Sequence, residues 1–164
     1  NMESIRDFFK SVINIFIALF KVLIQSKFNL VFPKQKGNDI AFLSYGTRLN
    51  EVKLASKILE THKISSTIAD ARFCKPLDKK LVLDLCRNHK LLITIEEGSI
   101  GGFGSHVLNF IIKNNDNFYQ RILIDTIELP DKFIDQDSPE NMYSIAKMNS
   151  TNIVTRVLRK LNIK

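Results

Sequence analysis

The chain alternates short apolar runs with amphipathic segments, and this alternation constrains its fold more than any other feature. Four runs have the length and residue types of buried strands: 40–43, 64–69, 91–95 and 122–127. Between and after them, apolar residues recur at the three-to-four spacing of helices. Such alternation is typical of an α/β domain with a mainly parallel sheet. We therefore expect a three-layer α/β fold, with helices on both faces of a twisted sheet of about five strands, one of them allowed to run antiparallel.

Several residues stand where helices are predicted to begin. Thr47 and Asp78 can each cap a helix whose apolar residues follow in the sequence. Ser138, Pro139 and Glu140 combine a cap, a first-turn proline and a first-turn acid. Because parallel sheets bind ligands at the carboxyl ends of their strands, functional residues are expected in the turns that follow the strands. Those turns are 44–47, 70–76, 96–104 and 128–133.

The first 36 residues differ from the rest of the chain in their pattern of apolar and polar residues. Apolar residues, many of them phenylalanine, recur at helical spacing over 3–32, and polar residues form a narrow stripe on the opposite side of the expected helix. This pattern predicts an insertion or linker over 1–36 that carries an extra N-terminal amphipathic helix, followed by one domain over 37–164. The longest uncharged run within residues 3–32, at 11–20, is too short for a membrane span, which needs about 20 residues. The helix can pack on protein, belong to a poorly ordered insertion or lie on a membrane surface; we favour packing on protein and expect no membrane partner.

Composition excludes several classes of protein. A length of 164 residues fits one folded domain. The net charge of +7 is uneven, with +4 in residues 1–36 and +3 in 37–164. Residues 37–164 show no stripe of Lys and Arg interleaved with aromatics, so we expect no nucleic-acid partner. Cys74 and Cys86 indicate neither a disulfide framework nor a zinc site and suit a reducing compartment. The three histidines lack metal-ligand spacing, and we predict no metal ligand.

A glycine-rich turn after the third strand is the first candidate site. Its glycines can serve close helix–sheet packing or a backbone cradle for phosphate. The spacing matches neither dinucleotide nor P-loop motifs, and the adjacent Glu96 and Glu97 would repel an anion, so packing is favoured. The glycines concerned are Gly101, Gly102 and Gly104.

Arg72, at the end of the second strand, is expected at the same sheet edge as the two glutamates. We predict an ion pair between Arg72 and Glu96 or Glu97, with contact to a substrate anion as the alternative. Together with Asp78 and the glycines, these residues form a predicted structural or ligand-binding edge. No acid–histidine–serine set can be argued from the residues, and none is predicted to be catalytic or to bind a cofactor.

Four segments resemble one enzyme family, in matching order and spacing. Asp70–Asp78 (DARFCKPLD) resembles the D-x-R-F-x-K-P-L-D of the transketolase C-terminal domain in 1-deoxy-D-xylulose-5-phosphate synthases. Leu43–Thr47 resembles its first strand and turn, residues 95–105 its T-x-E-E-x-x-x-G-G-F-G-S, and Leu129–Ile134 its L-P-D-x-F-I. The resemblance covers about 38–161. Transketolases and the β subunits of 2-oxo acid dehydrogenases share the E-E and G-F-G elements but usually lack the first and last segments, so the synthase is favoured.

The resemblance implies a parent enzyme that uses thiamine diphosphate and Mg²⁺. It would decarboxylate pyruvate and join the two-carbon unit to glyceraldehyde 3-phosphate, a step that feeds isoprenoid, thiamine and pyridoxal synthesis. In the family, a G-D-G…N-N motif holds the cofactor, and the activating glutamate lies in the middle domain; neither is present in this chain. The chain would be the third domain, structural and at a homodimer interface, with regulatory ligand binding sometimes proposed. Its partners would be the upstream domains, and alone it is expected to be inactive.

Two alternatives stay open at this point. The chain can be a stand-alone module that binds a partner or ligand through its sheet edge and basic N-terminal helix, or the C-terminal domain of another transketolase-like enzyme. The insertion, together with the frequent Ile, Lys and Asn that A/T-rich codons encode, favours the relict plastid (apicoplast type) of a parasite; the bacterial cytoplasm is the other location expected.

Overall fold

The computed structural model describes residues 10–17, 31–32, 38–114 and 122–163. The chain divides into two compact units, 1–30 and 31–164, and each is considered by itself. In the first unit residues 10–17 are helical, and their large apolar side chains are 44–71% exposed. The predicted helix over 3–32 otherwise lies outside the described residues, except at its end, where Val31–Phe32 form a strand instead. None of the helices in the described stretches is long and apolar enough to cross a membrane.

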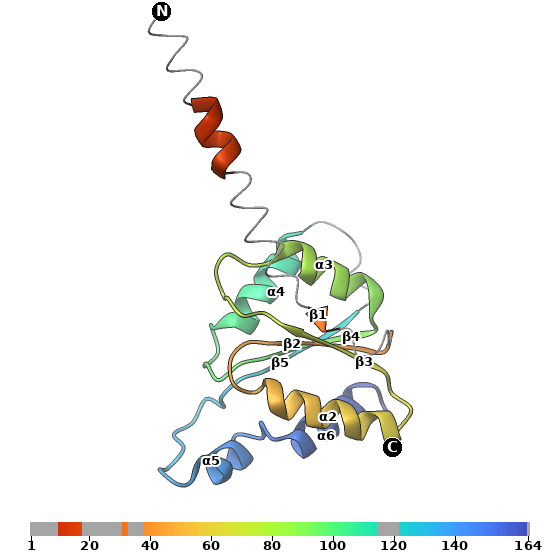
Figure 1. Ribbon diagram of the computed structural model, residues 1–164. Helices are drawn as coiled ribbons and strands as arrows, with labels where there is room; N and C mark the ends of the chain where they lie inside the picture. The colour runs from red at the N-terminus through yellow and green to blue at the C-terminus, as the bar shows by residue number, and fades with distance from the viewer. Residues whose placement is uncertain (1–9, 18–30, 33–37, 115–121, 164) are drawn as a thin grey trace, which may run out of the picture. The chain divides into compact units, whose positions relative to one another are not determined.

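The second unit is built on a five-stranded sheet with the order β1-β3-β2-β4-β5 (Figure 1). The strands are β1 (Val31–Phe32), β2 (Ile40–Ser44), β3 (Ser66–Asp70), β4 (Leu91–Ile95) and β5 (Leu123–Ile127). β2 to β5 run parallel to their neighbours, while β1 pairs antiparallel with β3. The predicted sheet is therefore confirmed, including its one antiparallel strand.

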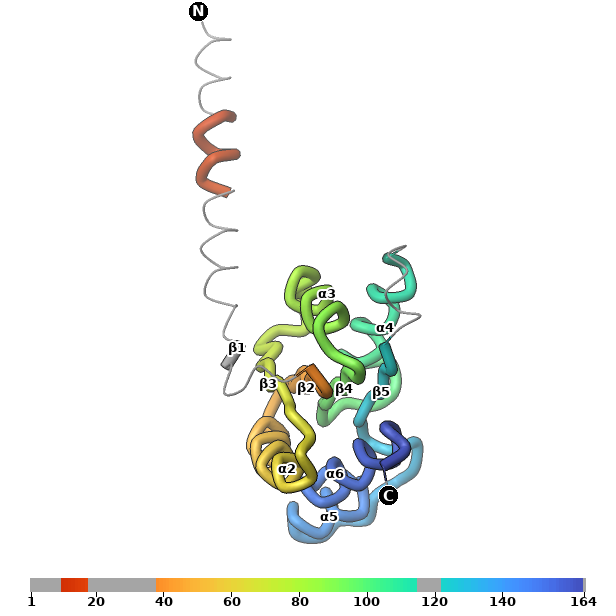
Figure 2. Tube along the Cα trace, turned by 90° about the vertical axis from the view of Figure 1, so that its right-hand side faces the viewer, coloured from red at the N-terminus to blue at the C-terminus, as the bar shows by residue number. Residues whose placement is uncertain are grey.

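Helices cover both faces of this sheet (Figures 1 and 2). α3 (Lys79–Asn88) and α4 (Phe103–Lys113) lie on one face. α2 (Leu49–Thr61) and α6 (Ser150–Lys160) pack on the other, with α5 (Pro139–Ile145) on that same side. Three layers are the arrangement that alternating strands and amphipathic helices require, because each apolar face must be buried.

The core is divided in two by the alternation of side chains along each strand. Ile40 and Phe42 of β2 pack with α2 and α6, whereas Ala41 and Leu43 pack with α3 and α4. Successive side chains of a strand point to opposite faces, so a strand covered on both sides is apolar at every position. All five residues of β2 are buried for this reason.

Two of the three predicted helix starts are confirmed. The Asp78 carboxylate accepts a hydrogen bond from the backbone N–H of the third residue of α3, at 2.9 Å. Ser138 caps α5, which has Pro139 in its first turn. The prediction for Thr47 is wrong: α2 begins one residue later, after Arg48, without a side-chain cap. The Thr47 hydroxyl instead donates to the Glu97 carboxylate, on the turn after β4, and its oxygen accepts from the Arg48 guanidinium and not from a helix N–H.

Candidate functional site

The four parallel strands end level with one another. Ser44 is in register with Asp70 on one side and with Ile95 on the other, and Ile95 is in register with Ile127. The turns that follow are tied together by backbone hydrogen bonds, such as that from Ala71 N–H to the Ser44 carbonyl at 2.8 Å. The four predicted turns therefore gather at one edge of the sheet.

Glu96 is buried at this edge, with 5% of its surface exposed. Its two carboxylate oxygens accept hydrogen bonds from the backbone N–H groups of Phe103 and Gly104, at 2.8 and 2.7 Å. These are the first two residues of α4, whose N–H groups have no partner within the helix. The carboxylate therefore satisfies the start of α4 and interacts favourably with the positive end of its dipole.

The glycines of the turn make room for this carboxylate. A Cβ at Gly98 would lie 2.6 Å from Glu96 Oε2, and one at Gly102 would overlap the same oxygen. A Cβ at Gly104 would lie 2.8 Å from Thr94 Oγ1, so this glycine allows α4 to approach β4. Gly101 has nothing nearby but adopts a φ of +101°, which favours glycine. These contacts support the packing interpretation, because Glu96 fills the place that a phosphate would need.

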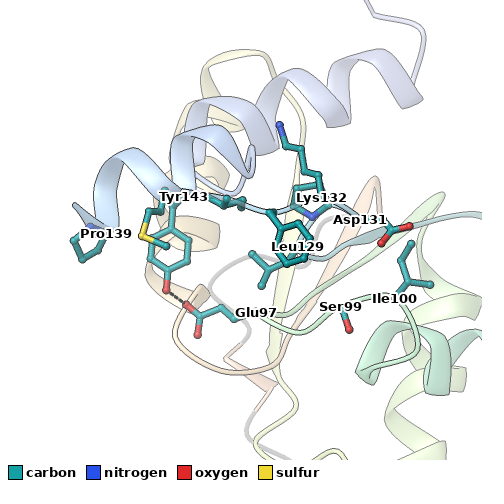
Figure 3. A pocket seen from close by; sticks show the side chains of 12 residues that line it. Glu97, Ser99, Ile100, Leu129, Asp131, Lys132, Pro139 and Tyr143 are labelled. Atoms are coloured by element: carbon teal, nitrogen blue, oxygen red, sulfur yellow. Dashed lines mark hydrogen bonds between the residues drawn. The ribbon is translucent and has the colours of Figure 1, made fainter. Parts of the chain in front are cut away.

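Glu97 has other partners than Glu96 and forms a cluster with three side chains. Its Oε1 accepts hydrogen bonds from Thr47 Oγ1 and Tyr143 OH, both at 2.5 Å, and the Arg48 Nε lies 3.0 Å away (Figure 3 shows the Tyr143 bond). The Arg48 guanidinium also lies over the Tyr143 ring, 3.4 Å from its centre. These contacts tie the turns after β2 and β4 to α5.

The same contacts set the ionisation of Glu97. Burial raises the pKa of the Glu97 carboxyl, but the hydrogen bonds from Thr47 and Tyr143 and the charge of Arg48 outweigh it, so its pKa is lower than usual. The hydrogen bond to Glu97 in turn raises the pKa of the Tyr143 hydroxyl. Glu97 is therefore held as an ionised acceptor, and a carboxylate held in this way is poorly suited to receive a proton in catalysis.

The predicted pairing of Arg72 is wrong. Arg72 Nε lies 3.7 Å from Asp70 Oδ2, and the arginine side chain is 39% exposed. β2 lies between β3 and β4 in the sheet, so the turn that carries Arg72 is not adjacent to the turn that carries the glutamates. The cation next to Glu97 is Arg48, because it follows β2, the direct neighbour of β4.

A cavity of about 1020 Å³ opens beside the Glu97 cluster (Figure 3). Most of its walls are apolar, and Glu97 and Tyr143 line it together with the polar Ser99, Asp131 and Lys132 (Figure 3). Phe133 on its wall is fully exposed and Ile100 is 68% exposed. Exposed apolar groups beside a concave surface indicate a place where another molecule is bound. The lining residues are Glu97, Ser99, Ile100, Leu129, Pro130, Asp131, Lys132, Phe133, Ile134, Pro139, Met142 and Tyr143.

The transketolase C-terminal domain family matches residues 31–153. The chain belongs to this family. The match begins at the first residue of β1, six residues before the predicted domain start at 37.

Solved structures of related fold agree with this assignment. A split-gene transketolase, described as an inactive β4 tetramer, is 24% identical and has a TM-score of 0.69 over 79% of this chain and 41% of that one. A transketolase from Pichia stipitis is 14% identical, with a TM-score of 0.58 over 81% of this chain and 17% of its own. The 2-oxoglutarate:ferredoxin oxidoreductase of Magnetococcus marinus is 15% identical, with a TM-score of 0.50 over 77% of this chain and 18% of its own. The chain thus spans less than half of each of these proteins.

The edge of this transketolase C-terminal domain does not fit Mg²⁺ and thiamine diphosphate. The N–H groups at the start of α4 already bind Glu96. Within the stretches that the structure describes, no three His, Cys, Asp or Glu side chains form a group that could hold a metal ion. A diphosphate–Mg²⁺ complex needs several oxygen ligands in one place, so we derive no catalytic step through it here.

Sequence reasoning missed two members of the Glu97 cluster. Arg48 could have been found, because it directly follows the turn after a predicted strand. Tyr143 could not, because it lies 46 positions from Glu97 and only the packing of α5 brings them together. Of the predicted site residues, Glu96, Gly102 and Gly104 meet at the start of α4, whereas Asp78 caps α3.

Proposed function

We propose that the chain is the C-terminal domain of a 1-deoxy-D-xylulose-5-phosphate synthase that uses thiamine diphosphate. The observation that carries the proposal is that the four segments resembling this family, spread over 43–134, meet at one edge of the sheet. Thr47 of the first segment donates to Glu97 of the third. Ala71 of the second donates to Ser44 of the first, and Leu129 of the fourth donates to the Gly98 carbonyl of the third at 2.9 Å.

The role of the domain in the parent enzyme would be structural. The upstream domains would hold Mg²⁺ and thiamine diphosphate and convert pyruvate and glyceraldehyde 3-phosphate to 1-deoxy-D-xylulose 5-phosphate and CO₂, for isoprenoid and thiamine synthesis. The exposed Phe133 and Ile100 beside the large cavity support an interface with those domains or with the second subunit of a homodimer. We further propose a location in an apicoplast-type plastid or in the bacterial cytoplasm, which only the composition and residues 1–36 support.

The decisive experiment uses the full-length native protein. Its mass should correspond to a protein several hundred residues longer than this 164-residue chain. With thiamine diphosphate and Mg²⁺ it should form 1-deoxy-D-xylulose 5-phosphate from pyruvate and glyceraldehyde 3-phosphate. The control reaction is the transfer of a two-carbon unit from xylulose 5-phosphate to ribose 5-phosphate, which a transketolase would catalyse and the synthase should not. A native protein that starts near Met2 would identify a stand-alone binding module instead.

The family match favours a second candidate, the C-terminal domain of another transketolase-like enzyme, such as a 2-oxo acid dehydrogenase β subunit. The matching family model describes a transketolase C-terminal domain and does not single out the synthase. The resemblance extends to these enzymes in the E-E and G-F-G elements, at Glu96–Glu97 and Gly102–Gly104, and the fold is shared with a 2-oxoglutarate:ferredoxin oxidoreductase. Activity with xylulose 5-phosphate, or oxidation of a 2-oxo acid without formation of the deoxy sugar, would select this candidate and overturn the synthase.

A further inference from the structure

A second cavity lies away from the Glu97 cluster, where the start of α3 meets α4. It has a volume of about 460 Å³ and shares no lining residue with the first cavity. Its lining residues come from around the start of α3 and from α4, the two helices that cover one face of the sheet, opposite α2 and α6 (Figure 2). Its lining residues are Pro76, Leu77, Lys79, His106, Asn109, Phe110, Lys113 and Asn114.

The polar side chains of this cavity are all able to donate hydrogen bonds. Lys79 and Lys113 carry ammonium groups, Asn109 and Asn114 carry amides, and His106 has an imidazole. No acidic residue is among the described residues that line it. A surface lined by two positive charges and three further donors is complementary to an anion that has several acceptor oxygens.

The Asn114 side-chain nitrogen is buried, and it finds no hydrogen-bond partner among the residues that the structure describes. A buried donor without a partner is costly, and a bound water or ion is one of the explanations for such a donor in a native protein. The apolar residues of the cavity lie next to the donors, with the Lys79 ammonium 5.8 Å from the centre of the Phe110 ring.

We propose that this cavity binds a small organic phosphate. The phosphate group would lie between Lys79, Lys113 and Asn114, and the organic part would pack on Leu77 and Phe110. A phosphate monoester presents three terminal oxygens, which suits five donors better than a single carboxylate does. The volume is within the range of small-molecule sites, which is about 300–1,000 Å³. The proposal does not depend on which enzyme the parent is.

The test is an NMR titration of the ¹⁵N-labelled 164-residue chain with phenyl phosphate. Saturable shifts are expected at the Leu77 and Asn109 backbone amides and at the side-chain amide of Asn114. Inorganic phosphate should bind the same residues more weakly, because it lacks an apolar part, and phenol should not bind. Equal affinities for phenyl phosphate and inorganic phosphate would show that the organic part does not pack on Leu77 and Phe110, and would overturn that part of the proposal.

Charge substitutions separate a built site from general attraction. Lys79→Gln and Lys113→Gln should each weaken phenyl phosphate about tenfold, as expected for loss of one charge-assisted hydrogen bond. Lys57→Gln, an exposed lysine on α2 at the opposite face, is the matched control and should leave the affinity unchanged. All three sites are exposed, so melting temperatures should confirm that the variants fold. Absence of saturable shifts, or equal weakening by Lys57→Gln, would overturn the proposal.

Discussion

Replacement of Glu96 by glutamine tests the conclusion that this buried carboxylate organises the start of α4. Glutamine has the same shape but only one acceptor oxygen. One of the two backbone N–H groups now bound, that of Phe103 or of Gly104, would then face an NH₂ group. The substitution also removes the negative charge from the positive end of the helix dipole.

The expected loss follows from these two changes. A hydrogen bond to a charged group contributes about 1.5–3 kcal/mol, and a charge at a partly buried helix end about 0.5–2 kcal/mol. The neutral amide is cheaper to bury than the carboxylate, which offsets part of the loss. We therefore expect Glu96→Gln to lower the free energy of unfolding by about 2–4 kcal/mol, a large share of the roughly 5–15 kcal/mol typical of a domain.

Urea denaturation followed by circular dichroism measures this change, with Glu60→Gln, an exposed glutamate on α2, as the matched control. The Phe103 and Gly104 amides should also exchange with solvent faster in Glu96→Gln than in the parent chain. A loss below about 0.5 kcal/mol, the range of ordinary surface substitutions, would refute the reasoning.

Three further outcomes are expected. Arg72→Ala should lower the free energy of unfolding, measured by thermal unfolding, by less than about 1 kcal/mol, because Arg72 is 39% exposed and its partner is Asp70. A loss of about 3 kcal/mol or more would instead indicate that Arg72 belongs to a buried ion pair. The pKa of Asp39 is lowered to about 2, chiefly by the hydrogen bond from Lys90. The ionised Asp39 therefore contributes fully to stability above about pH 4, and this contribution is lost as the pH falls towards 2. Unfolding measured across this range should be less pH-dependent in Asp39→Asn, and an unchanged profile would contradict the assignment. Titration calorimetry of the chain with thiamine diphosphate and Mg²⁺ should show no binding, and pyruvate should not be decarboxylated; turnover that Glu97→Gln abolishes would place the active site here.

The apolar runs of the sequence predicted the bounds of a strand correctly where the buried residues and the strand residues are the same. All five residues of β4 are buried, and its predicted bounds are the observed ones. For β3 the apolar run began too early, since Ile64 is buried but lies in the loop between α2 and β3. An apolar residue reports burial, and only its position in the fold decides whether the backbone there is a strand.

The sequence by itself determined the layers, the helix starts at Asp78 and Ser138, the membership in the transketolase C-terminal domain family, and the edge at which the motifs gather. These follow from local patterns, because side-chain periodicity and capping act within a few residues. Only the tertiary structure decided the partners of the charged residues. The strand order puts Arg48, and not Arg72, beside Glu97, and the packing of α5 brings Tyr143 to the same carboxylate. Apolar strands of similar length look alike in sequence, so their order depends on how the whole chain packs, and the ion pairs depend on that order.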